Sequence, residues 1–348
     1  MKIVNIMVAM LSLCIPGIAA KTEDIKTVLQ KTFEMEMEIS ETIKEEKMVE
    51  QFGMNVLPYA VDYLTDPNNN KKYYGKKMLF FLSQQKKDVA EKKEIVEAIL
   101  GKTLDNKQLR DEIYRGFPTL WQQDAYSDTI KQKLHELLIK QDEEIIPIIL
   151  HVGCAGMTSE LGLLKTIAEQ EVYPVEPDSW PCYGNAFTAL MARARMGEKE
   201  DIIKCIDLVK GFSCEHYCKY IDRSDHKTAG ILSKKVEDYR VQYLLREISY
   251  IRQPEVVEYI KSYIYSDQVT RNLGPDTVSQ SYADIAAEYL RQMIKDFPSI
   301  PYQEYKRYCT LGTSEERIQK KTIESRHKYF AEFYRSWFEQ QKELEIIR

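Results

Sequence analysis

The densest group of side chains that could do chemistry lies between residues 214 and 226. It combines thiols, imidazoles and carboxylates: Cys214, Glu215, His216, Cys218, Asp222, Asp225 and His226. Thiolate and imidazole are good ligands for zinc, and four such groups complete a tetrahedral site. Three residues separate the two cysteines, however, whereas the usual metal hairpin has two. The alternatives, in order of preference, are a disulfide, free thiols and a metal site.

A second unusual segment covers residues 171–182. It contains three prolines, which exclude a regular helix. Trp180 and Tyr183 lie near acidic residues there, and aromatic rings with carboxylates are typical of carbohydrate sites. The favoured interpretation is a connection whose Trp180 packs on the helices beneath it. Together the two segments form a possible ligand loop that comprises Trp180, Tyr183, His216, Asp225 and His226.

The cysteines bear on the redox compartment. Of the seven, Cys14 lies in the N-terminal apolar segment, and six remain: Cys154, Cys182, Cys205, Cys214, Cys218 and Cys309. An even number in an exported protein permits disulfides. We take Cys182, Cys214 and Cys218 as the disulfide candidates because they lie in expected loops. Cys154 and Cys205 are expected to be buried thiols, the latter on a helical stripe with Ile202, Ile203, Ile206 and Val209.

The first twenty residues have the three parts of a secretory signal. Lys2 supplies a positive charge, residues 3–15 are apolar, and small residues follow up to Ala20. This apolar run is shorter than the roughly 20 residues that span a bilayer. We therefore expect cleavage near Ala20 and an exported protein, periplasmic or secreted, with no transmembrane segment in the mature chain. Lipid attachment at Cys14 ranks second, because Leu13 is bulky where such signals have a small residue.

The balance of basic and acidic residues indicates which partners are not expected. The chain has 49 basic and 54 acidic residues, which alternate along the sequence rather than forming a basic surface. Binding to nucleic acid is therefore not expected. Mixed charge of this kind is typical of solvated helix faces.

Apolar periodicity predicts helices that would position these residues. Between residues 56 and 82, two apolar stripes with helical spacing flank the turn Asp66-Pro67-Asn68. Pro58 suits a first helical turn, where its missing N–H is not needed. A further stripe over residues 95–100 is expected to end at Gly101. No segment has the pattern of a β-sheet.

Residues 144–150 repeat the pattern of residues 55–61, with Pro147 in the place of Pro58. The two prolines lie 89 residues apart, which accommodates two repeats of about 40 to 47 residues. The helix pair at 52–83 resembles a HEAT-type repeat, as do 143–170 and 183–210 to a lesser degree. The resemblance implies an all-α protein, an irregular right-handed α-α superhelix of stacked helix pairs. It also implies a scaffold that binds proteins or peptides, and it carries over no catalytic residue.

The last helix is expected to begin near Thr313, which has capping-box spacing to Glu316. Its aromatic stripe comprises Phe330, Phe333, Tyr334, Trp337 and Phe338, and would cover the end of a helical stack. The expected divisions are a signal peptide (1–20), an N-terminal helical segment (21–50), HEAT-like repeats (51–310) with loops 171–182 and 211–228, and a C-terminal capping helix (311–348).

Three functional hypotheses follow. The first is an exported, non-enzymatic binding or scaffold protein that presents a helical groove to a protein or peptide partner. The second is an α/α-toroid enzyme that acts on a glycan, with the site in the two central loops. The third is a metal- or redox-responsive module at Cys214–Cys218. The sequence assigns no catalytic residue, cofactor or metal ligand, and it leaves the oligomeric state open.

Overall fold

The structure is a computed structural model that describes residues 27, 41–85, 88–117, 120–140, 145–170, 184–215, 229–270, 280–300 and 316–347. Over these residues the all-α prediction is confirmed, because they form helices and no β-strand. Two isolated antiparallel bridges pair Val269 with Ser281 and Ile294 with Ile346. None of the helices in these ranges is both long and apolar enough to cross a membrane.

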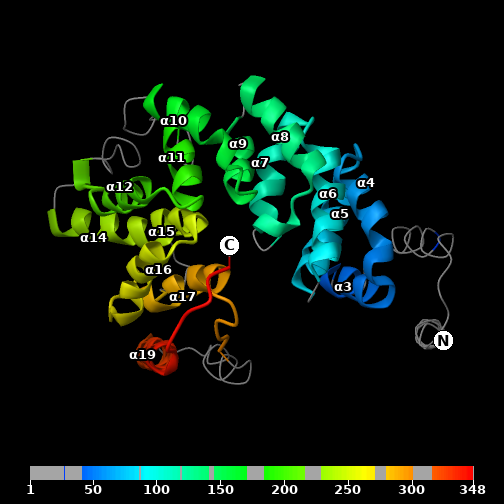
Figure 1. The fold of residues 1–348 in the computed structure, drawn as a ribbon. Helices are drawn as coiled ribbons and strands as arrows, with labels where there is room; N and C mark the ends of the chain where they lie inside the picture. The colour runs from blue at the N-terminus through cyan, green and yellow to red at the C-terminus, as the bar shows by residue number, and fades with distance from the viewer. Residues whose placement is uncertain are drawn as a thin grey trace, which may run out of the picture. The chain divides into compact units, whose positions relative to one another are not determined.

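The helices belong to two compact units, which are described separately (Figure 1). The first ends at Asp105 and the second begins at Asn106. This boundary lies inside the 51–310 segment that the sequence suggests is one array of repeats.

The first unit contains the predicted helix pair on either side of the Asp66-Pro67-Asn68 turn. Its elements are α3 (Glu41–Phe52), the 3₁₀ turn η1 (Gly53–Val56), α4 (Leu57–Leu64), α5 (Asn69–Gln84) and α6 (Val89–Thr103). Pro58 lies in the first turn of α4, as expected. The Asn68 side chain accepts a hydrogen bond from the Asn70 backbone N–H and so caps α5. The turn therefore both ends one helix and begins the next.

One predicted boundary in this unit is wrong. Helix α6 continues through Gly101 to Thr103, and the Leu104 N–H still donates to the Leu100 carbonyl. Thr103 and Leu104 are both buried. Burial of this last turn outweighs the cost of about 1 kcal/mol that an interior glycine adds to a helix.

The second unit begins at α7 and includes the remainder of the chain. Its first half comprises α7 (Lys107–Gly116), η2 (Gln123–Ala125), α8 (Asp128–Lys140), α9 (Ile146–Cys154), η3 (Thr158–Glu160), α10 (Leu161–Gln170), α11 (Asn185–Arg195) and α12 (Lys199–Lys210). Its second half comprises α14 (Ala229–Tyr239), η4 (Arg240–Leu244), α15 (Leu245–Ile248), η5 (Ser249–Ile251), α16 (Pro254–Lys261), η6 (Ser262–Tyr265), α17 (Tyr282–Met293) and α19 (Glu316–Gln340).

Helix α11 lies at the centre of the second unit. It packs against α9, α10, α12 and η5, and all its residues from Ala186 to Ala192 are buried. Its alanines present little bulk, so neighbouring backbones can come close. On the facing helix, a Cβ at Gly153 would overlap the Tyr250 hydroxyl and lie 2.9 Å from the Ala192 Cα. Only glycine permits this approach of α9 to α11.

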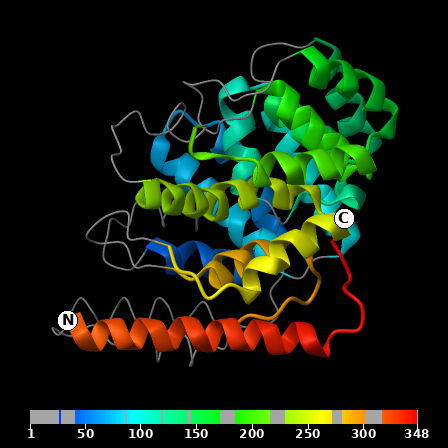
Figure 2. The same cartoon turned by 90° about the vertical axis from the view of Figure 1, so that its left-hand side faces the viewer.

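One apolar core joins α11 to the C-terminal helix α19, which lies beside α17 (Figure 2). The aromatic stripe predicted on α19 is confirmed: Phe330, Tyr334 and Phe338 are buried in this core, and Phe333 and Trp337 pack against it. Thr313, the expected cap of that helix, lies outside the described residues. After α19 the chain returns to α17, where Ile347 N–H donates to the Met293 carbonyl at 2.7 Å.

A π-helical segment, η4, interrupts the helix that begins at α14, and no local pattern predicts it. Its first residue, Arg240, donates to the carbonyls of Val209, Lys210 and Phe212 at the C-terminal end of α12. The last carbonyls of a helix have no partner within the helix. Arg240 therefore caps the C-terminal end of α12, although it lies on a neighbouring helical segment.

Replacing Arg240 with methionine is expected to destabilise the second unit by about 2 kcal/mol, because it removes hydrogen bonds to partly buried carbonyls. Urea unfolding followed by circular dichroism measures the effect. The control is Lys328→Met, which removes a solvent-exposed ion pair with Glu332 and should change stability by less than about 0.5 kcal/mol. Equal effects of the two substitutions would contradict the assigned role.

Candidate functional site

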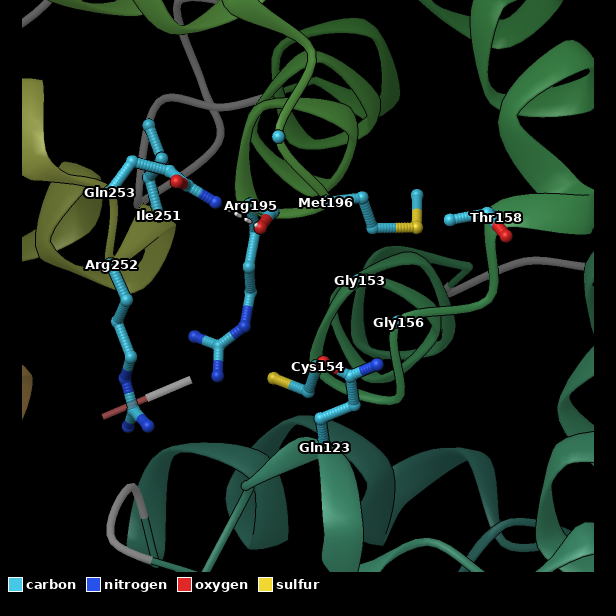
Figure 3. Close-up of a pocket in the computed structure, with 11 residues that line it drawn as sticks. Gln123, Gly153, Cys154, Gly156, Thr158, Arg195, Met196, Ile251, Arg252 and Gln253 are labelled. Carbon is cyan, nitrogen blue, oxygen red and sulfur yellow. Dashed lines mark hydrogen bonds between the residues drawn. The ribbon is translucent and has the colours of Figure 1, made fainter. Parts of the chain in front are cut away.

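The second unit contains a pocket of about 190 Å³ at the ends of several helices (Figure 3). Its lining is polar and contains two arginines, two glutamines and three glycines. The residues that line it are Gln123, Gly153, Cys154, Gly156, Thr158, Arg195, Met196, Gly197, Ile251, Arg252 and Gln253. They come from the η2 turn and from the turns that follow α9, α11 and η5.

Two of these turns have the same hydrogen-bond pattern. After α9, Met157 N–H donates to the Val152 carbonyl, and after α11, Glu198 N–H donates to the Arg193 carbonyl. Both bonds span five residues, as in a Schellman motif, whose key position is left-handed and usually glycine. Here Gly156 has a φ of 63° and Gly197 a φ of 101°. Both lining positions are therefore glycine because the turn requires a left-handed backbone there.

The third turn has an arginine where glycine would be expected. Arg252 follows η5 with a φ of 50° and a ψ of 46°, which is the left-handed region. For a residue with a Cβ, this left-handed conformation costs about 1 to 2 kcal/mol of backbone strain. Only two non-glycine residues in the described ranges have positive φ, Arg252 and Asp296. Strain at a pocket residue is an observation in favour of function.

Arg195, the last residue of α11, is held in place by neutral groups. Its guanidinium donates to the backbone carbonyls of Trp121, at 3.0 Å, and Tyr250. It also lies over the Tyr250 ring, 4.8 Å from the ring centre. It is only 8% exposed and forms no ion pair with any residue that the structure describes. Its positive charge is therefore buried without a carboxylate from the described residues.

The guanidinium of Arg252 adds a second buried positive charge to the pocket. Arg252 is 6% exposed, and burial, followed by the positive charge of Arg195, lowers its pKa to about 10. It is still charged at neutral pH. Figure 3 shows that Arg195 and Arg252 extend in the same direction, with the Cys154 sulfur directed toward Arg195. The pocket thus brings together two like charges that burial disfavours.

Cys154, the last residue of α9, is a buried free thiol, as the sequence predicted. The same holds for Cys205. The stripe expected around Cys205 is correct for Ile202, Ile206 and Val209 but wrong for Ile203, which is 57% exposed. Ile203 lies one residue off the buried i, i+3, i+4, i+7 series and so turns toward solvent.

A buried aromatic cluster supports the pocket. The Trp121 and His151 rings are 4.7 Å apart, and the Tyr114 ring lies 5.1 Å from His151. The Tyr126 hydroxyl and His151 Nδ1 are hydrogen-bonded at 2.8 Å. Burial lowers the pKa of His151 to about 3, so the ring is neutral at ordinary pH. His151 is therefore part of the hydrophobic support and not an acid or base for the pocket.

A second polar cluster joins α14 to α17, apart from the lining of the pocket. The Tyr282 hydroxyl donates to Asp238 at 2.8 Å, and Lys234 donates to Tyr282 at 2.7 Å. Burial, followed by the Asp238 carboxylate, raises the pKa of Tyr282, which keeps the phenol protonated. This arrangement ties two helices together and offers no nucleophile.

The residues that the sequence singled out are only partly placed. Cys214 has a free thiol, 4.0 Å from the Ser233 hydroxyl, so the bridge predicted for it is not formed. The other candidates lie outside the described residues: Trp180, Cys182, Tyr183, His216, Cys218, Asp225 and His226. Within the described ranges, no three His, Cys, Asp or Glu side chains are grouped as metal ligands.

Sequence reasoning missed both pocket arginines. A signal for Arg195 exists, because it ends an alanine-rich helix and immediately precedes the turn that contains Gly197. Nothing local marks Arg252, whose left-handed backbone is set by the turn into α16. Comparison with models of protein families, with curated proteins and with solved structures finds no match to this chain.

Proposed function

We propose that this is an exported, non-enzymatic binding protein, built as a HEAT-like superhelix, that takes one group of a peptide or protein partner into the pocket around Arg195. The observation that carries the proposal is the lining of the pocket. It offers hydrogen-bond donors and charge, but none of its residues is an Asp, Glu or His.

The size of the pocket supports binding of a single group. Sites for drug-sized molecules and cofactors occupy about 300 to 1,000 Å³, whereas this pocket has about 190 Å³. One side chain or chain terminus fits this volume better than a nucleotide or an oligosaccharide does. The rest of such a partner would lie on the surface around the pocket.

The lining also favours binding over glycoside hydrolysis. That reaction generally needs two carboxyl groups on either side of the bond that is broken. The lining residues provide Gln123 and Gln253 instead of acids, and the thiol of Cys154 is only 2% exposed. The glycan-enzyme hypothesis would therefore need a site elsewhere.

The superhelix is supported by the way helix pairs follow one another. Helices α9 and α10 both pack on α11, which in turn packs on α12, so successive pairs share a face. The turns after α9 and α11 repeat the same geometry at the pocket. Stacked pairs of this kind present their turns along one edge, where a partner can reach several at once.

The test is a selection of binders from a synthetic library of random peptides, with affinities measured by fluorescence polarisation. Thr158 is exposed at the rim of the pocket, and Thr158→Trp would fill it. We expect this change to weaken the selected peptides by about tenfold or more. The matched control is Thr166→Trp, on the exposed face of α10 away from the lining, which should leave affinity unchanged. Equal affinity in both variants, or no peptide selected at all, would contradict the proposal.

A further inference from the structure

Helix α5 of the first unit concentrates positive charge in a chain that is acidic as a whole. The chain has 54 acidic and 49 basic residues, whereas α5 has no acidic residue and four lysines: Lys71, Lys72, Lys76 and Lys77. Lys71 forms an ion pair with Asp66 at 3.1 Å, in the turn before the helix. A helix of this composition attracts negatively charged partners.

The packing of α5 on α4 determines which side of the helix faces solvent. A Cβ at Gly75 would lie 2.7 Å from the Ala60 carbonyl oxygen and 2.8 Å from the Tyr63 Cβ, so glycine is needed for this close approach. Met78 and Leu82 are buried on the same side of the helix. The opposite side is therefore directed away from the core of the unit.

That opposite side presents two aromatic rings together with two lysines. Tyr73, Lys76, Lys77 and Phe80 have the spacing i, i+3, i+4, i+7, which places them on one face of the helix. Tyr73 and Phe80 are each 46% exposed. The Lys77 Nζ lies 4.6 Å from the centre of the Tyr73 ring, and the Phe80 ring contacts Phe81 edge-on. Aromatic and cationic groups are thus interleaved on one exposed face.

We propose that this outer face of α5, formed by Tyr73, Lys76, Lys77 and Phe80, binds the surface of a membrane that contains anionic lipids. The lysine ammonium groups would lie at the level of the lipid phosphates. The two rings would enter the boundary between headgroups and acyl chains. The site belongs to the first unit and is independent of the pocket around Arg195.

The chemistry of the face favours a lipid surface over a protein partner. Lysine keeps its charged end in water while its methylene groups lie along apolar surface. Phenylalanine supplies the apolar contact of interfacial helices, and tyrosine combines an apolar ring with a hydroxyl that suits the membrane–water boundary. A lipid surface needs charge and apolar side chains but no matched shape, and the outward side of one helix supplies both.

The charge of the remainder of the chain would set the orientation. With a net charge of −5, the protein as a whole is repelled by an anionic surface. Attraction acts only where basic side chains come within about 10 Å of the lipid phosphates, which is the screening length at 0.1 M salt. The protein is therefore expected to bind with α5 toward the membrane.

The experiment measures binding of the mature chain to vesicles by co-sedimentation at low ionic strength. One set of vesicles contains phosphatidylglycerol and phosphatidylcholine in equal parts, and the other contains phosphatidylcholine alone. We expect saturable binding to the anionic vesicles and little binding to the neutral ones. Added salt should release the protein, because it screens exposed charges.

Two double variants separate the components of the face. Tyr73→Ala with Phe80→Ala removes the rings, and Lys76→Gln with Lys77→Gln removes two charges. Each is expected to weaken binding to the anionic vesicles by about tenfold or more. Circular dichroism confirms that each variant is folded.

The matched control for the rings is Ile139→Ala with Ile203→Ala. Each of these isoleucines is 57% exposed, on α8 and α12 of the second unit, so their loss should leave binding unchanged. If a double variant does not fold, Phe80→Trp tests the same face. Its fluorescence should shift to shorter wavelength on anionic vesicles, whereas Ile203→Trp should add no shift.

Three results would overturn the inference: no binding to anionic vesicles, equal binding to neutral ones, or unchanged binding in the folded Tyr73→Ala, Phe80→Ala variant. Binding of polyglutamate without binding of vesicles would assign the face to an acidic protein instead. Self-association that the same variant abolishes, without vesicle binding, would assign it to a second copy of this chain. None of these results involves the peptides selected for the pocket, so failure here is distinct from failure of the proposed function.

Discussion

The second unit is expected to lose about 3 kcal/mol of stability through His151 when the pH falls from 7 to 4. His151 is 1% exposed, and burial lowers its pKa from 6.5 to about 3. Between these two values the unfolded chain binds a proton that the folded chain does not. The stabilisation is therefore complete above pH 6.5 and is lost as the pH falls toward 3.

Urea unfolding at pH 7 and pH 4 measures this loss, with tryptophan fluorescence as the signal. Trp121, Trp180 and Trp337 all follow Asp105, so the fluorescence reports on the second unit. His151→Phe should lose most of the difference between the two pH values. His135→Gln is the control, because His135 is partly exposed and hydrogen-bonded to Glu160 at 3.0 Å. Parallel pH dependence in the parent chain and His151→Phe would show that the histidine is not the cause.

Replacement of Arg195 by methionine is expected to destabilise the same unit by about 3 kcal/mol. It leaves the Trp121 and Tyr250 carbonyls without their donor and removes the packing of the guanidinium on the Tyr250 ring.

Thermal and urea unfolding of Arg195→Met, compared with Arg246→Met, measure this effect. Arg246 is exposed on α15 and pairs with its sequence neighbour Glu247, so its loss should cost less than about 0.5 kcal/mol. If Arg195→Met were as stable as the parent chain, its hydrogen bonds would not support the fold. Arg195 would then have a role in binding alone.

Local patterns in the sequence were sufficient for the helices but not for the pocket. Periodicity and proline position predicted α4 and α9, because apolar spacing and an N-terminal proline act within a few residues. The same reasoning placed the end of α6 too early at Gly101, because burial of the next turn depends on residues far along the chain. A glycine that would end a helix is overridden where the next turn is buried against other residues.

The pocket was not predicted because it depends on contacts between distant segments. Arg195 meets the carbonyl of Trp121 and that of Tyr250, which are 74 and 55 residues away in sequence. No pattern within a short stretch of sequence predicts contacts between residues so far apart in the chain. The π-helical segment at Arg240 was missed for the same reason, since its donors reach α12 rather than its own helix.

The burial of α11 on every side has a consequence for motion. A helix covered by α9, α10, α12 and η5 cannot expose its backbone by fraying or by the opening of one neighbour. Its amide hydrogens should therefore exchange with solvent only when the whole unit opens. Arg195 ends this helix, so a ligand bound there is attached to the slowest-exchanging part of the molecule. Hydrogen exchange of α11 would then report ligand binding as a slowing of global opening, even where no contact with the ligand exists.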